Sequence, residues 1–275
     1  MKFQKVAIIT AKPDPASQNI KTKLLALGFA ETSESFEGEK VYSLGDCRVY
    51  TPSKQPIDCE HLDKQIEADL FVFATKHRSE AGKHSLSVHV PGNWGKAELG
   101  GQDGHLCIVP ASVIRIALLE LQTAAKGLQY EVTLEATHHG PLVDKPCFFI
   151  EIGSDESQWS NEEAGRIIAE TIMKTLDRRE ETFPTVMVLG GGHYNQLANR
   201  ILSGTNYAVG HICAKYALKE LDSQLIVQAI KRSVEPVEMI ILDWKGLGDQ
   251  KEKIKELEKT CSLKFKRFKE VMHEE

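Results

Sequence analysis

Three histidine-bearing segments contain the residues of this chain that are best suited to chemistry. The longest runs from residue 76 to 101, and the shorter sequences THHGP and GGGHY complete a set of six: His77, His84, His89, His138, His139 and His193. Imidazole titrates near neutral pH and is a common metal ligand. Several imidazoles in one place can hold a metal ion that activates water, or can take a proton from water themselves. The three segments therefore predict a hydrolytic site.

Other residues in the same segments are candidates for binding a substrate. They supply positive charge, hydrogen-bonding groups, one large aromatic face and a glycine turn: Lys76, Arg78, Ser79, Asn93, Trp94, Gly191 and Gly192. A glycine-rich turn between a strand and a helix leaves backbone N–H groups free to meet an anion. The alternative is that each histidine is a surface or capping residue and that the glycines only form a tight turn. The density of such residues favours a functional site.

Glu151 is a carboxylate inside an otherwise apolar run, residues 146–152 (PCFFIEI). An acid in such a run is either a paired core residue or a group that supports a metal-bound histidine. Both interpretations stay open from the sequence. The candidate metal ligands are His77, His84, His89, His138 and Glu151, and the candidate catalytic residues are His84, His138, His139 and His193.

Several familiar site patterns are absent from the chain. It contains no HExxH sequence, which would indicate a zinc protease, and no GxSxG sequence, which would indicate a serine hydrolase. The six cysteines lie far apart without a CxxC pair. A zinc ribbon, a redox pair and a small disulfide scaffold are therefore disfavoured.

Each histidine-bearing segment follows a predicted strand. These strands are residues 70–74 (LFVFA), 130–136 and 185–189 (TVMVL). In open α/β sheets, ligands bind outside the carboxyl ends of the strands, so we expect the three segments to form one site there. Residues 76–101 have neither helical nor strand periodicity and are predicted to form a long functional loop.

Strands and helices alternate along the rest of the chain. Helices are predicted between Pro13 and Gly28 and over residues 57–68, 110–128, 160–176, 212–218, 222–232 and 250–269; further strands over 6–10, 146–152 and 237–242; and a β meander over 29–50. Ser160 and Glu163 have the spacing of a capping box at a helix start. The alternation predicts an α/β fold, with one three-layer α/β/α domain over residues 1–275 and a mostly parallel or mixed sheet.

The composition limits the class of protein. With 275 residues, 41% of them apolar, the chain can bury a large core. No run approaches the roughly 18 apolar residues of a membrane helix, and reduced thiols are the default for scattered cysteines, so a soluble cytoplasmic protein is expected. The net charge of −5 gives no overall basic surface, so a nucleic acid would have to be held by local patches.

Four blocks of the sequence together resemble the archaeal and plant type of D-aminoacyl-tRNA deacylase. They are VAIITAKPDPAS, KHRSEAGKHSLSVHVPGNW, EATHHGP and GGGHY, and the likeness extends over nearly the whole chain. The resemblance implies a fold similar to those of peptidyl-tRNA hydrolases and nucleoside phosphorylases. It also implies a cytoplasmic zinc-dependent hydrolase that releases D-amino acids from tRNA and so protects translation from them. The implied partner is the acceptor 3′ end of D-aminoacyl-tRNA, with no membrane and no obligate protein partner.

The resemblance also implies how the substrate would be held. Lys76, Arg78 and Lys83 would meet phosphates of the tRNA 3′ end, and Trp94 would offer a face on which the terminal adenine stacks. His138 and His139 are neighbours and would point to opposite sides of an extended backbone. One of the two would then bind metal or activate water while the other orients a partner.

Two other functions stay open from the sequence. One is a metal-dependent hydrolase of a small nucleoside or amide, which the acidic net charge favours. The other is a non-catalytic RNA-binding protein with structural histidines. Stoichiometric metal binding would separate the hydrolases from the RNA-binding protein, and dependence of turnover on an intact tRNA would separate the two hydrolases from each other.

Overall fold

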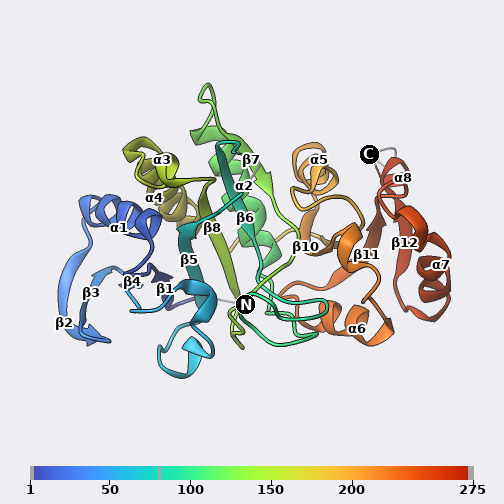
Figure 1. Ribbon diagram of the computed structural model, residues 1–275, viewed down its shortest axis with the longest axis horizontal. Helices are drawn as coiled ribbons and strands as arrows, with labels where there is room; N and C mark the ends of the chain where they lie inside the picture. The colour runs from blue at the N-terminus through green and yellow to red at the C-terminus, as the bar shows by residue number, and fades with distance from the viewer. Residues whose placement is uncertain (1–2, 80–81, 272–275) are drawn as a thin grey trace.

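The computed structural model describes residues 3–79 and 82–271, and a mixed eight-stranded sheet forms its larger part (Figure 1). In chain order the strands of this sheet are β1 (Val6–Ile9), β2 (Ala30–Phe36), β3 (Glu39–Leu44), β4 (Cys47–Tyr50), β5 (Leu70–Lys76), β6 (Ser85–His89), β7 (Glu131–Leu134) and β8 (Cys147–Gly153). Their spatial order is β2-β3-β4-β1-β5-β8-β6-β7. Strands β4, β1, β5 and β8 are parallel, whereas β6 runs antiparallel to β8. The α/β class with a mixed sheet is thus confirmed.

A second, parallel sheet has the order β10-β9-β11-β12. Its strands are β9 (Thr185–Leu189), β10 (Ala208–Cys213), β11 (Val237–Leu242) and β12 (Lys264–Arg267). The two sheets meet just beyond the end of β7. There the Thr137 amide donates to the Ile212 carbonyl over 3.0 Å, and Glu135 pairs with Tyr194 in an isolated antiparallel bridge. This junction brings the end of β9 to the end of β7.

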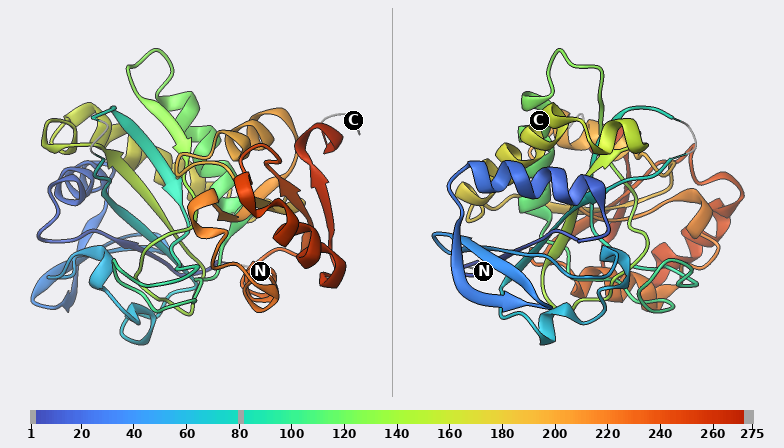
Figure 2. Two further views of the ribbon diagram at one scale, coloured as in Figure 1. Left: turned by 45° about the vertical axis from the view of Figure 1, so that its right-hand side comes forward. Right: turned by 60° about the vertical axis from the view of Figure 1, so that its left-hand side comes forward.

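Helices cover both sheets. Their bounds are α1 (Pro15–Ala26), α2 (Ala111–Ala124), α3 (Glu156–Trp159), α4 (Glu162–Asp177), α5 (Gln196–Gly204), α6 (Ser223–Lys231), α7 (Lys251–Thr260) and α8 (Phe268–Val271). Helices α1 and α4 lie side by side, and α2 packs on α4, β6 and β10, so that it spans the two sheets (Figure 2). None of the helices among the described residues has the length and apolar character needed to cross a membrane.

Strand β9 is buried on both faces, which accounts for its continuously apolar sequence. Val186 and Val188 face the main core, which includes α5, whereas Met187 and Leu189 face a smaller core formed with α6 and α7. Successive side chains of a strand point to opposite faces, so a strand between two layers needs apolar residues at every position. The Gly190–Gly192 turn is thereby held at the end of a rigid strand.

Strand β6 lies within the segment that was predicted to be a loop, and that prediction is wrong. Residues Ser85–His89 are all buried and lie between β8 and β7. Ser85, Ser87 and His89 alternate along the strand and share one face. The sequence SLSVH does alternate between polar and apolar residues, but its polar face is buried, whereas the polar face of an alternating strand usually meets water.

Four other local predictions also need correction. Residues 57–68 form two short 3₁₀ helices, Pro56–Asp58 and Leu62–Lys64, and residues 212–218 begin inside β10. The predicted helix at 250–269 ends with α7 at Thr260, after which β12 adds to the second sheet. Helix α4 is capped by Asn161 and not by Ser160, since the Asn161 side chain accepts hydrogen bonds from two backbone amides of the first turn.

Two loops cross in backbone contact beside His138 and His139. The Gly140 amide donates to the Leu99 carbonyl over 2.9 Å, and a Cβ atom added at Gly140 would lie only 2.2 Å from the amide nitrogen of Gly101. The Glu60 carboxylate joins the loops, because it accepts hydrogen bonds from the amides of Gly101 and Leu142. A glycine at position 140 is required for this crossing.

We therefore expect the substitution Gly140→Ala to reduce the free energy of unfolding by about 1–3 kcal/mol, the usual cost of overpacking. Gly210→Ala is the matched control, because a Cβ atom there would meet its nearest neighbours at 3.5 Å, an ordinary contact distance. Urea unfolding of both variants measures the difference. Equal stability of the two variants would contradict the close approach of the loops.

Candidate active site

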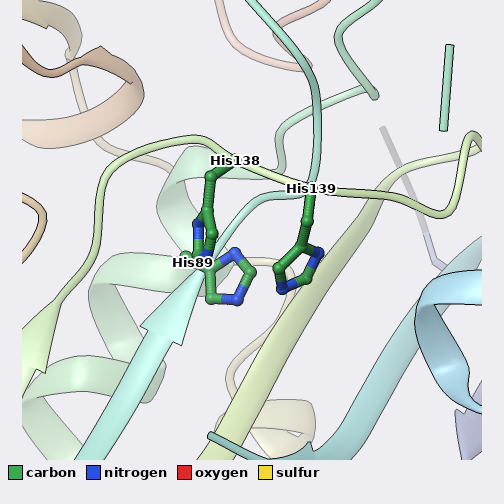
Figure 3. A group of neighbouring side chains, drawn as sticks. All are labelled: His89, His138 and His139. Atoms are coloured by element: carbon green, nitrogen blue, oxygen red, sulfur yellow. The ribbon is translucent and has the colours of Figure 1, made fainter. Parts of the chain in front are cut away.

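Five histidines and two glutamates converge near the junction of the two sheets. Each comes from the end of a strand or from the segment that follows it: His77 after β5, His89 in β6, Glu135, His138 and His139 after β7, Glu151 in β8, and His193 after β9. Figure 3 shows three of them, His89, His138 and His139, whose ring centroids lie 4.2 to 4.8 Å apart. The predicted convergence of the three histidine-bearing segments is therefore observed.

His138 and His139 both point into this cluster, contrary to the expectation for neighbours on an extended strand. The reason is the backbone at His139, whose φ of 42° lies in the left-handed region. A turn of this kind places consecutive side chains on the same side. Non-glycine residues in this region cost about 1–3 kcal/mol and are found preferentially at functional sites.

Three of the imidazole rings are held by the same kind of hydrogen bond, from Nδ1 to a backbone carbonyl. The Nδ1 atoms of His89, His138 and His139 lie 3.3, 2.8 and 2.5 Å from the backbone carbonyls of Val90, Ala136 and Gly140. A carbonyl only accepts hydrogen bonds, so each Nδ1 carries a proton and donates it. In a neutral ring the Nε2 lone pair then faces the cluster, as in histidines that bind metal.

Glu135 is a central member of the cluster that sequence reasoning did not identify. One of its carboxylate oxygens lies 3.1 Å from His193 Nε2 and 3.6 Å from His138 Nε2, and the other lies 3.3 Å from His77 Nδ1. The available signal was a lone acid at the end of a predicted strand, three residues before His138. Buried charges are normally paired, so this acid needs the histidines around it.

Glu151 lies across the cluster from Glu135 and is also buried. One of its oxygens accepts a hydrogen bond from the Thr75 hydroxyl at 2.8 Å, and the other lies 3.4 Å from His89 Nε2 and 3.6 Å from His77 Nδ1. Burial raises the pKa of Glu151, but the neighbouring imidazoles of His77 and His89 outweigh burial and hold the pKa below its usual value. Glu151 therefore stays ionised.

The histidines divide into two electrostatic classes. Burial, followed by the charge of His89, lowers the pKa of His139 to about 4, and burial with three neighbouring histidines places the pKa of His138 well below its usual value. For His77, burial acts in the same direction, but the contact with Glu151 and the charges of both carboxylates raise the pKa to about 9. His138 and His139 are thus neutral at pH 7 and available as metal ligands or bases.

The cluster has the properties of a metal site. Its buried atoms without a hydrogen-bond partner include His77 Nε2, His89 Nε2, one oxygen of Glu151 and both of Glu135. Unsatisfied buried polar atoms are rare and costly, and several of them in one place are typical of a site that can take a cation. Three triplets have donor atoms within 4.8 Å of one another: His89, His138 and His139; His77, Glu135 and His193; and His89, Glu135 and Glu151. Imidazole nitrogens and carboxylate oxygens are zinc donors, and these residues fit that metal.

Two cavities open on the cluster. The smaller one, of about 320 Å³, is lined by His77, His193 and Glu151 together with the apolar side chains of Ile57 and Phe149. The larger one, of about 500 Å³, lies against Trp94 and Tyr216. Both are lined by Leu99, His138 and His139, so these three residues stand between the two cavities. A substrate that reaches from one cavity to the other would cross the histidines.

His84 and Trp94 do not have the surroundings that their predicted roles require. His84 is exposed and precedes Ser85, so its side chain belongs to the opposite face of β6, where its ring lies 6.1 Å from that of Tyr130. The structure therefore places His84 outside the cluster of histidines and glutamates. Trp94 is only 4% exposed, and its indole N–H donates to the Ile212 carbonyl, so its ring is a core residue and not an open stacking face.

Lys76 and Arg78 line the smaller cavity, and the Lys76 ammonium lies 5.4 Å from the centre of the Trp159 ring. Ser79 lies beside a different hollow, near Ser154, whose carbonyl accepts a hydrogen bond from the Ser79 amide. Lys76 and Arg78 thus reach the site, whereas Ser79 lies at its periphery and Lys83 pairs with Glu131 and lines neither cavity.

Asn93 and the glycine turn support the site from within. The side-chain amide of Asn93 donates a hydrogen bond to the Gly100 carbonyl over 3.0 Å and so holds the loop that carries Leu99. The Gly191 carbonyl accepts a hydrogen bond from the Lys215 amide, and the turn is closed from Gly190 by a hydrogen bond with the buried Asn195. Gly192 is open, because an added Cβ atom would meet no neighbour closer than 3.7 Å.

A family model, two related sequences and a solved structure each match this chain over most of its length. A family model described as D-aminoacyl-tRNA deacylase matches residues 64–266. A D-aminoacyl-tRNA deacylase of Pyrococcus furiosus is 41% identical over 267 residues, which cover 94% of this chain and 98% of that protein, and one of Methanosarcina acetivorans is 37% identical over 251 residues, which cover 83% and 81%. A crystal structure of a conserved protein of unknown function matches 98% of both chains with a TM-score of 0.90 and 28% identity.

The match to the family model covers more than half of the chain and includes the whole of the histidine and glutamate cluster. The relatives are matched over most of their own length as well. Since the family acts on an ester bond, the chain is an enzyme of the hydrolase class. It belongs to the D-aminoacyl-tRNA deacylase family.

Proposed function

We propose that this chain hydrolyses the ester bond between a D-amino acid and the 3′ end of tRNA, and so keeps D-amino acids out of translation. The observation that carries the proposal is the set of inward-facing, neutral Nε2 atoms of His138 and His139 beside two buried carboxylates, between two cavities. Membership in the deacylase family supports the choice of substrate.

We propose zinc as the cofactor, held by donor atoms from the triplets described above. When bound, the ion supplies Lewis acidity, which polarises a carbonyl group and makes water more acidic. The carboxylates support this proposal. His89 directs Nε2 at Glu151, and in a neutral ring this would place a lone pair against a negative charge. Such a contact is favourable only if the ring is protonated or if a cation lies between the two groups.

His193 is suited to act as the general base. Its Nε2 lies 3.1 Å from a Glu135 oxygen, and this carboxylate holds the ring with the proton on Nε2. Nδ1, which lies 3.5 Å from the Tyr216 hydroxyl group, then carries the lone pair that can take a proton from the attacking water. A base that is oriented by a buried carboxylate keeps one tautomer and one direction, which general base catalysis requires.

Lys76 and Arg78 supply positive charge at the smaller cavity. The chain as a whole is acidic, so these local cations are proposed to attract the polyanionic tRNA toward the site. Apolar side chains of the same cavity, among them Ile57 and Phe149, are suited to an amino-acid side chain without selecting strongly for one. The cavity therefore fits a deacylase with broad tolerance of the amino acid.

The metal proposal has a test that does not depend on activity. We expect the purified protein to contain zinc by elemental analysis, and we expect the metal-free protein to melt at a lower temperature and to recover on addition of zinc, because a ligand that binds only the folded state stabilises it. His89→Ala should reduce the zinc content. A purified protein that contains no zinc, and whose melting temperature and activity change neither with added zinc nor with a chelator, would argue for a metal-free site.

The catalytic assignment predicts different outcomes for two histidines. Replacing His138 by Ala should reduce the rate of deacylation about 100-fold or more, because it removes a group that faces the reacting atoms. His84→Ala is the matched control and should stay within about 3-fold of the wild type, because its ring lies outside the cluster. Circular dichroism would verify the fold of both variants. A large loss of deacylation rate in His84→Ala would show that His84 belongs to the site.

The substrate assignment predicts that D-Tyr-tRNA is hydrolysed much faster than L-Tyr-tRNA at equal enzyme concentration. A site that places the α-amino group, the carbonyl and the side chain can reject the wrong hand through a clash or an unpaired polar group. Release of labelled tyrosine from both substrates measures the ratio. Equal rates would exclude a proofreading role, and no release from either would favour a small-molecule hydrolase.

A further inference from the structure

An exposed aromatic ring stands beside the histidines, on the side of the larger cavity. Tyr216 lies in the short 3₁₀ helix Lys215–Ala217, directly after β10, and is 52% exposed. Its hydroxyl group lies 3.5 Å from Nδ1 of His193. The ring lines the larger cavity together with His138 and His139. Tyr216 lies outside the three histidine-bearing segments, and the sequence did not indicate it.

Two exposed apolar side chains line the larger cavity. Only five large hydrophobic residues are exposed in the described part of the chain, and two of them, Tyr216 and Leu99, line this one cavity. Leu99 is 59% exposed. An exposed apolar patch at a functional site indicates a surface that a ligand covers. The two side chains offer one aromatic face and one aliphatic face to such a ligand.

The charges around this cavity indicate which part of a ligand it accepts. The Lys96 ammonium lies 3.4 Å from a carboxylate oxygen of Asp103, and the Lys219 ammonium lies 3.6 Å from one of Glu220. Glu98 adds a further negative charge to the lining. The lining thus carries two lysines and two glutamates, Glu98 and Glu220, and offers no net positive charge to phosphate groups. The cavity is therefore suited to an uncharged flat ring, such as a nucleobase, and not to the phosphate backbone.

We propose that Tyr216 is the stacking face for the terminal adenine of the tRNA, which enters the larger cavity between Tyr216 and Leu99. The proposal rests on the proposed function, since it names the nucleotide subsite of the same reaction. The terminal ribose then places the ester at His138 and His139, and the amino acid extends into the smaller cavity beside Phe149. The volumes of about 500 and 320 Å³ follow the relative sizes of the two groups. Tyr216 takes the role that the sequence had indicated for Trp94.

Steady-state deacylation of D-Tyr-tRNA by Tyr216 variants tests this subsite. Stacking of a base on an aromatic side chain is worth about 1–3 kcal/mol, so Tyr216→Ala should raise KM roughly 5- to 150-fold with little change in kcat. Tyr216→Phe and Tyr216→Trp keep an aromatic face and should retain a KM near that of the wild type. Val227→Ala is the control, because Val227 is an exposed apolar residue that lines neither cavity.

Two results would overturn the assignment. If Tyr216→Phe lowers kcat as much as Tyr216→Ala, the hydroxyl group positions His193 and the ring does not bind the base. If the effect of Tyr216→Ala differs between D-Tyr-tRNA and D-Ala-tRNA, the ring contacts the amino-acid side chain. Under the proposal, both substrates suffer the same increase in KM, because their terminal adenine is the same.

Direct binding of adenosine separates this inference from the proposed function. Equilibrium dialysis with labelled adenosine should detect binding to the wild type and its loss in Tyr216→Ala. Adenosine binding that depends on Tyr216 in a protein that deacylates no tRNA would support the subsite while the proposed function failed. Normal deacylation by Tyr216→Ala together with unchanged adenosine binding would leave the function standing and refute the subsite.

Discussion

The burial of Glu135 and Glu151 in one small volume is the constraint on which the site depends. Two ionised carboxylates in a medium of low polarity are unfavourable unless positive charge accompanies them. His77 and His89 can supply that charge as protons, which the raised pKa values of both rings reflect, and a bound cation can supply it instead. The same carboxylates orient the surrounding imidazoles. The chemistry of the site therefore depends on the positive charge that offsets the burial of these two carboxylates.

Both sheets contribute side chains to the cluster. The larger sheet contributes His89 and Glu151 from adjacent antiparallel strands, where Ser87 pairs with Glu151 in register. The second sheet contributes His193 at the end of β9. The sheets meet where Glu135 bridges Tyr194, and the Ala136 amide donates to the His193 carbonyl over 2.8 Å. The site is complete only because this junction holds the two sheets together.

Close backbone contacts give the site its shape. The crossing of the loops at Gly140 and Gly101 sets Leu99 between the two cavities and holds the corner that carries His138 and His139. The left-handed backbone at His139 then directs both rings inward. Rigid support of this kind keeps reacting groups within a fraction of an ångström of their working positions, which catalysis requires. The cavities are thus a result of the loops as much as of the sheets.

The sequence by itself determined the α/β class, most strands and helices, and the convergence of three histidine-bearing segments, because apolar runs and strand-end polar residues are local signals. Only the tertiary structure decided which histidines take part. Strand β6 turns its serines and His89 toward buried polar groups and leaves His84 on the opposite face, a distinction that depends on where the strand begins. Glu135 and Tyr216 are placed beside His193 by contacts across the sheet junction, whereas Trp94 is buried in the core. Such contacts join residues far apart in the chain, and no local pattern encodes them.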